Sequence, residues 1–86
     1  MEIKVSEIYE KYKGNQHQIL EELKTLLQGK EIKLYEFDND VEKYDYMDTY
    51  NIVDLFFWED DQIVFSFGPT EYDICSIQET DLIICN

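Results

Sequence analysis

The sequence predicts an α+β domain in which two N-terminal helices pack on one face of a four- to five-stranded antiparallel sheet. Three observations lead to this fold class. Apolar residues recur with a helical period as far as Gly29 and with a period of two beyond it, and the connections between the later apolar runs are short. A length of 86 residues with 44 % hydrophobic residues fits a single small acidic domain, residues 1–86, with a packed core.

Both helices are predicted from apolar residues that recur on one helical face. In the first helix these residues are Val5, Ile8, Tyr9 and Tyr12, with Ser6 as the expected N-cap and Gly14 as the end. Asn15 is the expected N-cap of the second helix, and Gln18 three residues later completes a capping-box pattern. The apolar stripe of the second helix consists of Ile19, Leu20, Leu23, Leu26 and Leu27, and Gly29 follows it.

Five runs after Gly29 are predicted to be strands, the first from its alternating pattern and the second and third from β-branched and aromatic residues, which favour strands. They cover residues 31–37, 51–58, 63–67, 72–77 and 82–85. The polar residues 59–62 predict a hairpin turn between the second and third runs, and residues 78–81 predict another between the last two. Because short connections join antiparallel neighbours, we expect these strands to form one sheet.

Two features of the predicted fold have more than one interpretation. Residues 38–50 are acidic and rich in tyrosine, and they fit a loop, a short helix or an extended edge strand. The run 51–58 has apolar residues on both faces, and the helices cover only one face of a sheet. The second face is therefore a partly exposed aromatic surface, a dimer interface or a shallow second core.

The net charge of −13 comes entirely from residues 31–86. Residues 1–30 contain five acids and five lysines, whereas residues 31–86 contain 15 acids and only Lys33 and Lys43. A one-sided negative field repels nucleic acids and anionic membranes and attracts basic protein surfaces. The chain also contains no arginine, the usual residue for bidentate binding of phosphate or carboxylate groups. We therefore expect a basic protein partner, with no direct binding to nucleic acid or membrane and with a homodimer as a further possibility.

Acidic and aromatic residues are interleaved most densely between residues 38 and 50. Carboxylates spaced along a surface can take the place of a run of phosphates, and tyrosines supply rigid contact area at low entropic cost. A second acidic cluster lies at the first predicted hairpin turn. The candidate partner-binding residues are Asp38, Asp40, Glu42, Tyr44, Asp45, Tyr46, Asp48, Tyr50, Glu59, Asp60 and Asp61. The alternative interpretation is a solvated face that keeps a small aromatic-rich domain in solution.

No motif predicts catalysis, a cofactor or a specific metal site. The acids at positions 38, 40 and 42 are spaced as at the start of an EF-hand loop, but Lys43 stands where that loop needs glycine and Thr49 where it needs glutamate. His17 is the only histidine, and Cys75 and Cys85 lie in apolar runs where a thiol behaves as a small hydrophobe. We therefore expect a protein that is not an enzyme and holds no cofactor.

In size and charge, the chain is similar to phage-encoded acidic inhibitors, including anti-CRISPR proteins, and to immunity proteins that neutralise nuclease toxins. The resemblance involves no shared motif and assigns no residue. It implies an inhibitor that blocks a basic, nucleic-acid-handling protein such as a nuclease, partly as a mimic of nucleic acid. No segment resembles a signal peptide or a membrane span, so we expect a cytoplasmic location, in the host cell if the protein is phage-encoded. The alternative hypothesis is a structural or assembly protein that homodimerises or docks through an aromatic sheet face containing Phe56 and Trp58.

Overall fold

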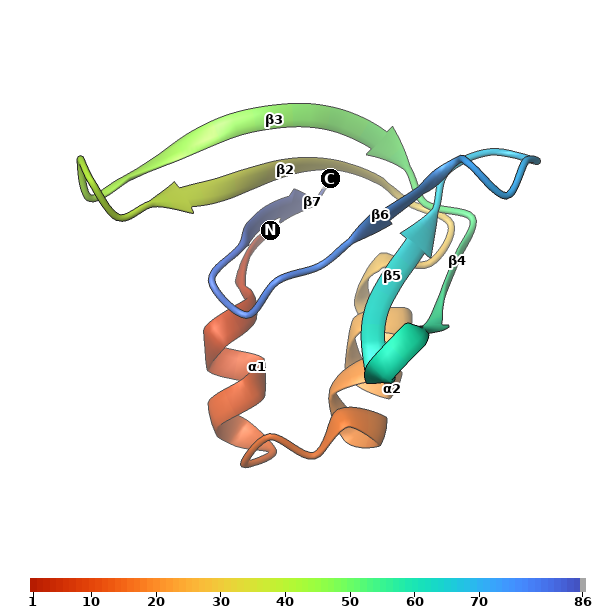
Figure 1. Ribbon diagram of the computed structural model, residues 1–86, viewed down its shortest axis with the longest axis horizontal. Coiled ribbons are helices and arrows are strands. Elements are labelled where there is room, and N and C mark those ends of the chain that lie inside the picture. The colour runs from red at the N-terminus through yellow and green to blue at the C-terminus, as the bar shows by residue number, and fades with distance from the viewer. Residues whose placement is uncertain (86) are drawn as a thin grey trace.

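The chain folds into two antiparallel β-sheets and two α-helices (Figure 1), which a computed structural model describes for residues 1–85. The helices are α1 (Val5–Lys11) and α2 (Gln16–Leu27), and η1 (Glu59–Asp61) is a single 3-10 turn. The strands, in chain order, are β1 (Glu2–Lys4), β2 (Glu31–Asp38), β3 (Lys43–Asn51), β4 (Asp54–Trp58), β5 (Gln62–Ser66), β6 (Ile74–Ser76) and β7 (Leu82–Cys85).

The prediction of two N-terminal helices on one four- to five-stranded sheet is wrong. Four strands form a first sheet in the order β1-β7-β2-β3, three form a second sheet in the order β4-β5-β6, and β1 precedes the first helix. The chain leaves the first sheet at Ile52, whose N–H and C=O bond to Lys30 and Gly29 at 2.9 and 2.8 Å. The predicted strand 51–58 is therefore divided between the end of β3 and β4. Side-chain periodicity shows that a segment is half-buried, but it does not show which strand lies beside it.

The predicted hairpin around residues 78–81 is also wrong, because this turn joins two different sheets. Strand β6 pairs with β5, whereas β7 lies between β1 and β2. After β6, the Ile77 N–H donates a hydrogen bond to the Ile63 carbonyl of β5 at 2.9 Å. The Asp81 N–H donates to the Gln78 carbonyl at 3.1 Å and so forms the turn that leads to β7. The predicted hairpin at residues 59–62 is confirmed, since β4 and β5 pair antiparallel across η1.

Both predicted helices are present, and one of their two predicted caps is correct. Helix α1 begins one residue after Lys4, and no side chain caps it, so the predicted capping role of Ser6 is wrong. The N-cap of α2 is Asn15, whose Oδ1 accepts a hydrogen bond from the Gln18 N–H at 3.2 Å. This bond satisfies one of the N–H groups that the first turn of a helix leaves without an internal partner.

The core lies between the first sheet, the two helices and one face of the second sheet. The apolar stripe predicted for α2 faces this core, with four residues buried and Leu26 partly buried. Phe65 of β5 is the largest of the fully buried side chains among residues 1–85. Each such side chain contributes roughly 1.5–3 kcal/mol relative to its exposure to water. The first sheet turns one face toward this core, called its inner face below, and no helix covers its outer face.

Residues 38–50, for which the sequence allowed three structures, form the end of β2, a turn at residues 39–42 and most of β3. Strand β3 is an edge of the first sheet and has β2 as its only strand neighbour among the described residues. Figure 1 shows β3 along the top of the molecule, with the turn between β2 and β3 extending to the far left. Most of β3 is exposed, because only its last residues reach the core.

Candidate functional site

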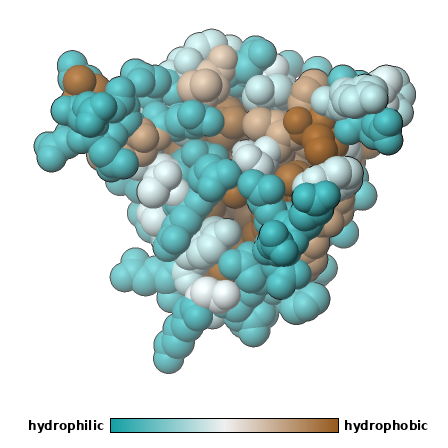
Figure 2. All heavy atoms as spheres, in the orientation of Figure 1, coloured by the Kyte–Doolittle hydropathy of each residue, from teal (hydrophilic) through white to brown (hydrophobic). Residues whose placement is uncertain are grey.

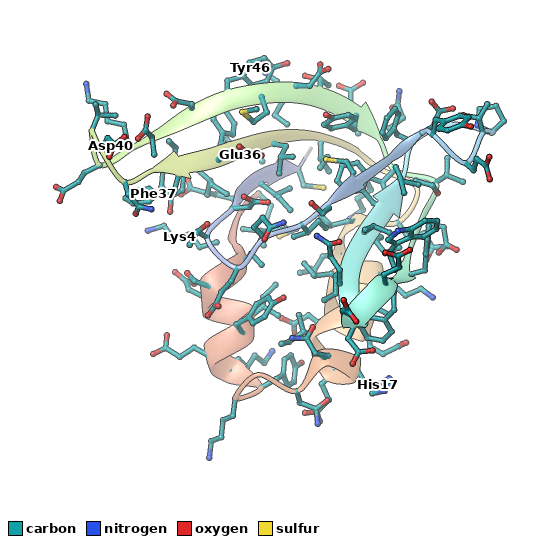
Figure 3. All side chains as sticks on the ribbon, viewed as in Figure 1. Lys4, His17, Glu36, Phe37, Asp40 and Tyr46 are labelled. Atoms are coloured by element: carbon teal, nitrogen blue, oxygen red, sulfur yellow. The ribbon has the colours of Figure 1, made fainter. Side chains whose placement is uncertain are left out.

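The β2–β3 hairpin projects past the other strands as a two-stranded arm. Strand β7 pairs with β2 only as far as Tyr35, opposite Leu82, whereas β2 and β3 continue to pair out to Asp38 and Lys43. We call residues 36–45, which lie beyond the last β7 pair, the acidic arm. The acidic arm contains five acids and one lysine, a net charge of −4. Figure 3 shows Asp40 at its tip.

The two faces of the acidic arm differ in chemistry, because alternate residues of a strand point to opposite faces. Glu36 continues the inner face defined by the buried Leu34, and Asp45 lies directly opposite Glu36 on β3. The outer face carries aromatic cross-strand pairs instead, one at the base of the arm and one within it. Their ring centroids are 5.5 Å apart in one pair and 5.2 Å in the other, and the pairs are Tyr35–Tyr46 and Phe37–Tyr44. Tyr44 and Tyr46 therefore lie on the face opposite to Glu36 and Asp45.

Aromatic pairs at the base of the arm and within it stabilise the pairing of β2 with β3. A two-stranded hairpin without further packing is marginally stable in water. Each T-shaped aromatic pair adds about 0.5–1.5 kcal/mol beyond the apolar area that it buries. The register of the two strands shifts between Leu34 and Tyr35 of β2, where β3 has a bulge. This bulge places Tyr46 opposite Tyr35. Figure 3 shows Tyr46 projecting away from the rest of the molecule.

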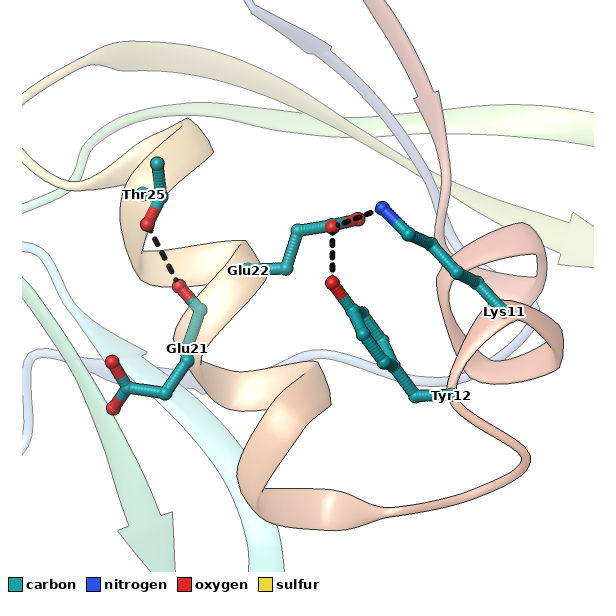
Figure 4. Close-up of polar contacts among 5 residues, drawn as sticks. All are labelled: Lys11, Tyr12, Glu21, Glu22 and Thr25. Carbon is teal, nitrogen blue, oxygen red and sulfur yellow. Dashed lines mark hydrogen bonds and ion pairs between the residues drawn. The ribbon is translucent and has the colours of Figure 1, made fainter.

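The inner face of the arm contains like charges in direct opposition. Glu36 lies opposite Asp45, an arrangement that destabilises a sheet. No lysine compensates this pair: the one ion pair among residues 1–85 joins Lys11 Nζ to Glu22 Oε1 at 2.6 Å, at the junction of the two helices (Figure 4). Within the arm, Lys43 faces only Asp38 across the two strands, so the arm keeps a net charge of −4. Figure 2 shows this end of the molecule covered mainly by hydrophilic atoms on the visible face.

The ion pair between the helices is an example of a carboxylate that stabilises the fold. Glu22 Oε1 also accepts a hydrogen bond from the Tyr12 hydroxyl at 2.6 Å, and Lys11 and Tyr12 together hold the pKa of Glu22 below its usual value. Figure 4 shows these side chains converging between α1 and α2. None of the carboxylates in the acidic arm has a comparable arrangement among the residues that the structure describes.

The tip of the arm is a tight turn with exposed acids. The Asp40 N–H donates to Asp38 Oδ1 at 2.9 Å, which fixes the start of the turn. Glu42 has a φ of 53°, in the left-handed region that non-glycine residues rarely occupy. The side chains of Asp40 and Glu42 are both exposed, so the tip presents two carboxylates to solvent.

The three candidate tyrosines have different environments. Tyr44 and Tyr46 are 38 % and 53 % exposed on the outer face. Tyr50 lies on the inner face and packs against Phe65 and Phe67, with ring centroids 5.1 and 4.9 Å away. Burial raises the pKa of Tyr50 to about 12. Tyr50 therefore extends the core, and only the other two tyrosines offer open contact area.

The second predicted acidic cluster, Glu59, Asp60 and Asp61, is remote from the arm. These residues form η1 between β4 and β5, and Figure 1 places η1 and the β2–β3 turn on opposite sides of the molecule. Asp60 and Asp61 both have positive φ values, 55° and 60°, and all three side chains are exposed. The predicted site residues therefore lie on two separate surfaces and not on one.

The structure adds one acid that the sequence did not identify. Asp81, in the turn before β7, is only 2 % exposed, and its Oδ2 accepts a hydrogen bond from the Gln78 N–H at 2.8 Å. The pKa of Asp81 is raised to about 6, mainly by burial; the hydrogen bond from Gln78 opposes this rise and the charge of Glu36 adds to it. The sequence around Asp81 is that of an ordinary polar turn and contains no signal of this burial.

Among residues 1–85, no three His, Cys, Asp or Glu side chains are arranged to hold a metal ion. Within the same residues, neither helix has the length and apolar composition needed to cross a membrane. Comparisons with protein-family models, with curated proteins and with solved structures gave no match. The functional inference therefore depends on the acidic arm, the open edge of β3 and the exposed aromatic residues.

Proposed function

We propose that this chain is a small acidic inhibitor, of the nucleic-acid-mimic or immunity type, that binds a basic, nucleic-acid-handling protein in the cytoplasm. The acidic arm enters the groove in which that protein holds DNA or RNA and occupies its lysine and arginine side chains. The single observation that carries this proposal is the projecting arm with a net charge of −4 and like charges in direct opposition. The opposed acids of the arm do not stabilise the chain itself. A cationic groove would supply the positive charges that the arm lacks.

The charge of the arm acts mainly on the approach of the partner. Complementary potentials steer encounter and raise the association rate, and salt screens this effect over about 8–10 Å. The affinity of the final complex depends on a few well-packed contacts. We assign these contacts to Tyr44 and Tyr46, together with the inner-face acids Glu36, Asp45 and Asp48. Asp48 lies opposite Leu34 at the base of the arm.

The proposal is tested with two variants that remove equal charge from opposite sides of the molecule. The arm variant carries Asp40→Asn, Glu42→Gln and Asp45→Asn. The matched control variant carries the corresponding amides at the three acids of η1. These three carboxylates are exposed, and their number equals the number of acids changed in the arm variant. Each tagged protein is incubated with host lysate, eluted with increasing salt and challenged with a DNA or RNA oligonucleotide, and the retained proteins are identified by mass spectrometry.

We expect the natural chain and the η1 variant to retain the same nucleic-acid-binding protein at moderate salt, and the oligonucleotide to displace it. The arm variant should lose at least about tenfold in affinity for that protein. Equal retention by the two variants would contradict the proposal, because it would show that only the total charge matters. A broad set of basic proteins released at low salt would also contradict it, since any polyanion behaves in that way.

A second candidate function is an assembly protein that pairs through the outer face of the second sheet. Trp58 is 43 % exposed and lies beside Phe56, with ring centroids 6.3 Å apart, on the face of β4 that points away from the buried Leu55. Figure 2 shows hydrophobic atoms gathered over the region where β5 and β6 lie. Sedimentation velocity over a wide concentration range tests this function, with Trp58→Ser as the variant. A monomeric natural chain at every concentration would exclude homodimerisation.

A further inference from the structure

Strand β3 presents an open backbone edge along the acidic arm. Its pairing with β2 uses one side of the strand, and none of the backbone hydrogen bonds made outside helices and strands involves residues 43–51. The Thr49 N–H bonds to the neighbouring Asp48 Oδ1 at 2.7 Å, so the open length is residues 43–48. A row of unpaired N–H and C=O groups of this kind is a template for one more strand.

This edge lacks three of the devices by which proteins protect an edge strand. It is nine residues long, it contains no proline, and no described helix or loop bonds to it. Its protection consists of charge and of the bulge at Met47. Charge discriminates between occupants, because a second copy of the chain would bring another arm of charge −4 against the first. The same charge attracts a cationic strand.

We propose that the partner of the acidic arm adds a basic extended segment to β3, as a fifth strand of the first sheet. This inference rests on the proposed function and specifies how the partner is held. On the inner face, basic side chains of the added strand lie beside Asp45 and relieve its opposition to Glu36. On the outer face, apolar side chains or lysine methylene groups pack beside Tyr44 and Tyr46. The partner segment therefore alternates basic with apolar or β-branched residues.

Both kinds of contact follow from the chemistry of the edge. The backbone of the added strand forms hydrogen bonds with residues 43–48, a mode of recognition that depends little on sequence. Opposite charges facing each other across two strands are favourable, in contrast to the present pair of acids. The exposed tyrosine rings also accept cations over their faces. Sequence selectivity then comes from the alternation of the side chains.

Synthetic peptides test this mode of binding to the full chain. The first peptide alternates lysine with valine or threonine, and a second has the same composition with all lysines grouped at one end. Two further versions of the first peptide carry N-methyl groups on alternate backbone amides. In one version these amides lie along one edge of the extended peptide, and in the other version along the opposite edge. Affinities are measured by titration, and hydrogen exchange of the backbone amides of residues 43–48 is followed by NMR with and without each peptide. The η1 amide variant provides the control for total charge.

We expect the alternating peptide to bind at least about tenfold more tightly than the grouped one and to slow exchange along residues 43–48. Only one of the two methylated peptides should lose binding, because an added strand uses one of its edges. Unchanged exchange in β3, or equal affinities of the two methylated peptides, would overturn strand addition. If all cationic peptides bind equally and the arm variant abolishes this binding, the proposed function stands without strand addition. If no cationic peptide binds at low salt, both proposals fail.

Discussion

Replacement of Asp81 by asparagine should stabilise this protein at neutral pH. The carboxylate of Asp81 is almost completely buried, and the Gln78 N–H is its hydrogen-bond donor at 2.8 Å. Burial raises the pKa of Asp81 from 3.8 to about 6, the hydrogen bond from Gln78 opposes this rise, and Glu36 adds to it. At pH 7.5 the folded chain therefore holds a charge that the unfolded chain accommodates more easily in water.

The difference between the two pKa values sets the magnitude. A change of about two pKa units corresponds to about 3 kcal/mol. The folded state binds the extra proton, so this contribution to stability is fully present below about pH 4 and is lost as the pH rises through about 6. Asparagine removes the charge and keeps an oxygen that accepts from Gln78, but its NH₂ group needs a new partner. After this cost of about 1–2 kcal/mol, we expect a net stabilisation of about 1–2 kcal/mol at pH 7.5.

Urea unfolding of the natural chain and the Asp81→Asn variant at pH 4.5 and pH 7.5 measures this difference. The variant should be more stable at pH 7.5 and should lose that advantage at pH 4.5. The neighbouring Glu79 is exposed, so Glu79→Gln removes one charge from the same turn and serves as the control. The assignment of a destabilising buried charge at Asp81 would be refuted if the Asp81→Asn variant were less stable than the natural chain at pH 7.5. It would also be refuted if the gain in unfolding free energy were no larger than that of the control.

Three further predictions concern charge, the arm and the core. Added sodium chloride should raise the melting temperature, because it screens the repulsion among 13 uncompensated charges; a flat response would contradict this prediction. Glu36→Gln should slow hydrogen exchange in residues 36–45 by relieving the opposition to Asp45, and it should weaken partner capture in the same lysate assay; stronger capture would contradict the proposed role. Leu23→Ala, at a fully buried position of α2, should cost about 2–5 kcal/mol in urea unfolding, and a loss below 1 kcal/mol would place Leu23 outside the core.

The helices and strands could be located from the sequence because each depends on neighbours along the chain. The stripe of α2 from Ile19 to Leu27 and its cap at Asn15 involve residues within one or two helical turns. The first strand after the helices and the β4–β5 hairpin were predicted for the same reason. β1 was not predicted, since three residues contain no period and pair with β7 at the other end of the chain.

The candidate site was predicted as a region but not as a surface. The density of acids between residues 38 and 50 indicated the segment that became the arm. Its division into an acidic face and an aromatic face required that residues 38–50 be a strand, and this was one of three open alternatives. The position of Tyr50 against Phe65 depends on the second sheet, which no local pattern indicated. The distance between the arm and η1 likewise depends on how the two sheets are placed (Figure 1).

By itself, the sequence determined the helices, the approximate positions of most strands, the sign of the charge and the segment that carries it. These properties depend on residue type and on spacing over a few positions. Only the tertiary structure decided that the strands form two sheets, that β3 has an open edge, that Glu36 opposes Asp45 and that Asp81 is buried. Each of these features depends on contacts between residues that are distant in the chain. The free energy of such contacts comes from packing of the whole core, and it leaves no periodic pattern in the local sequence.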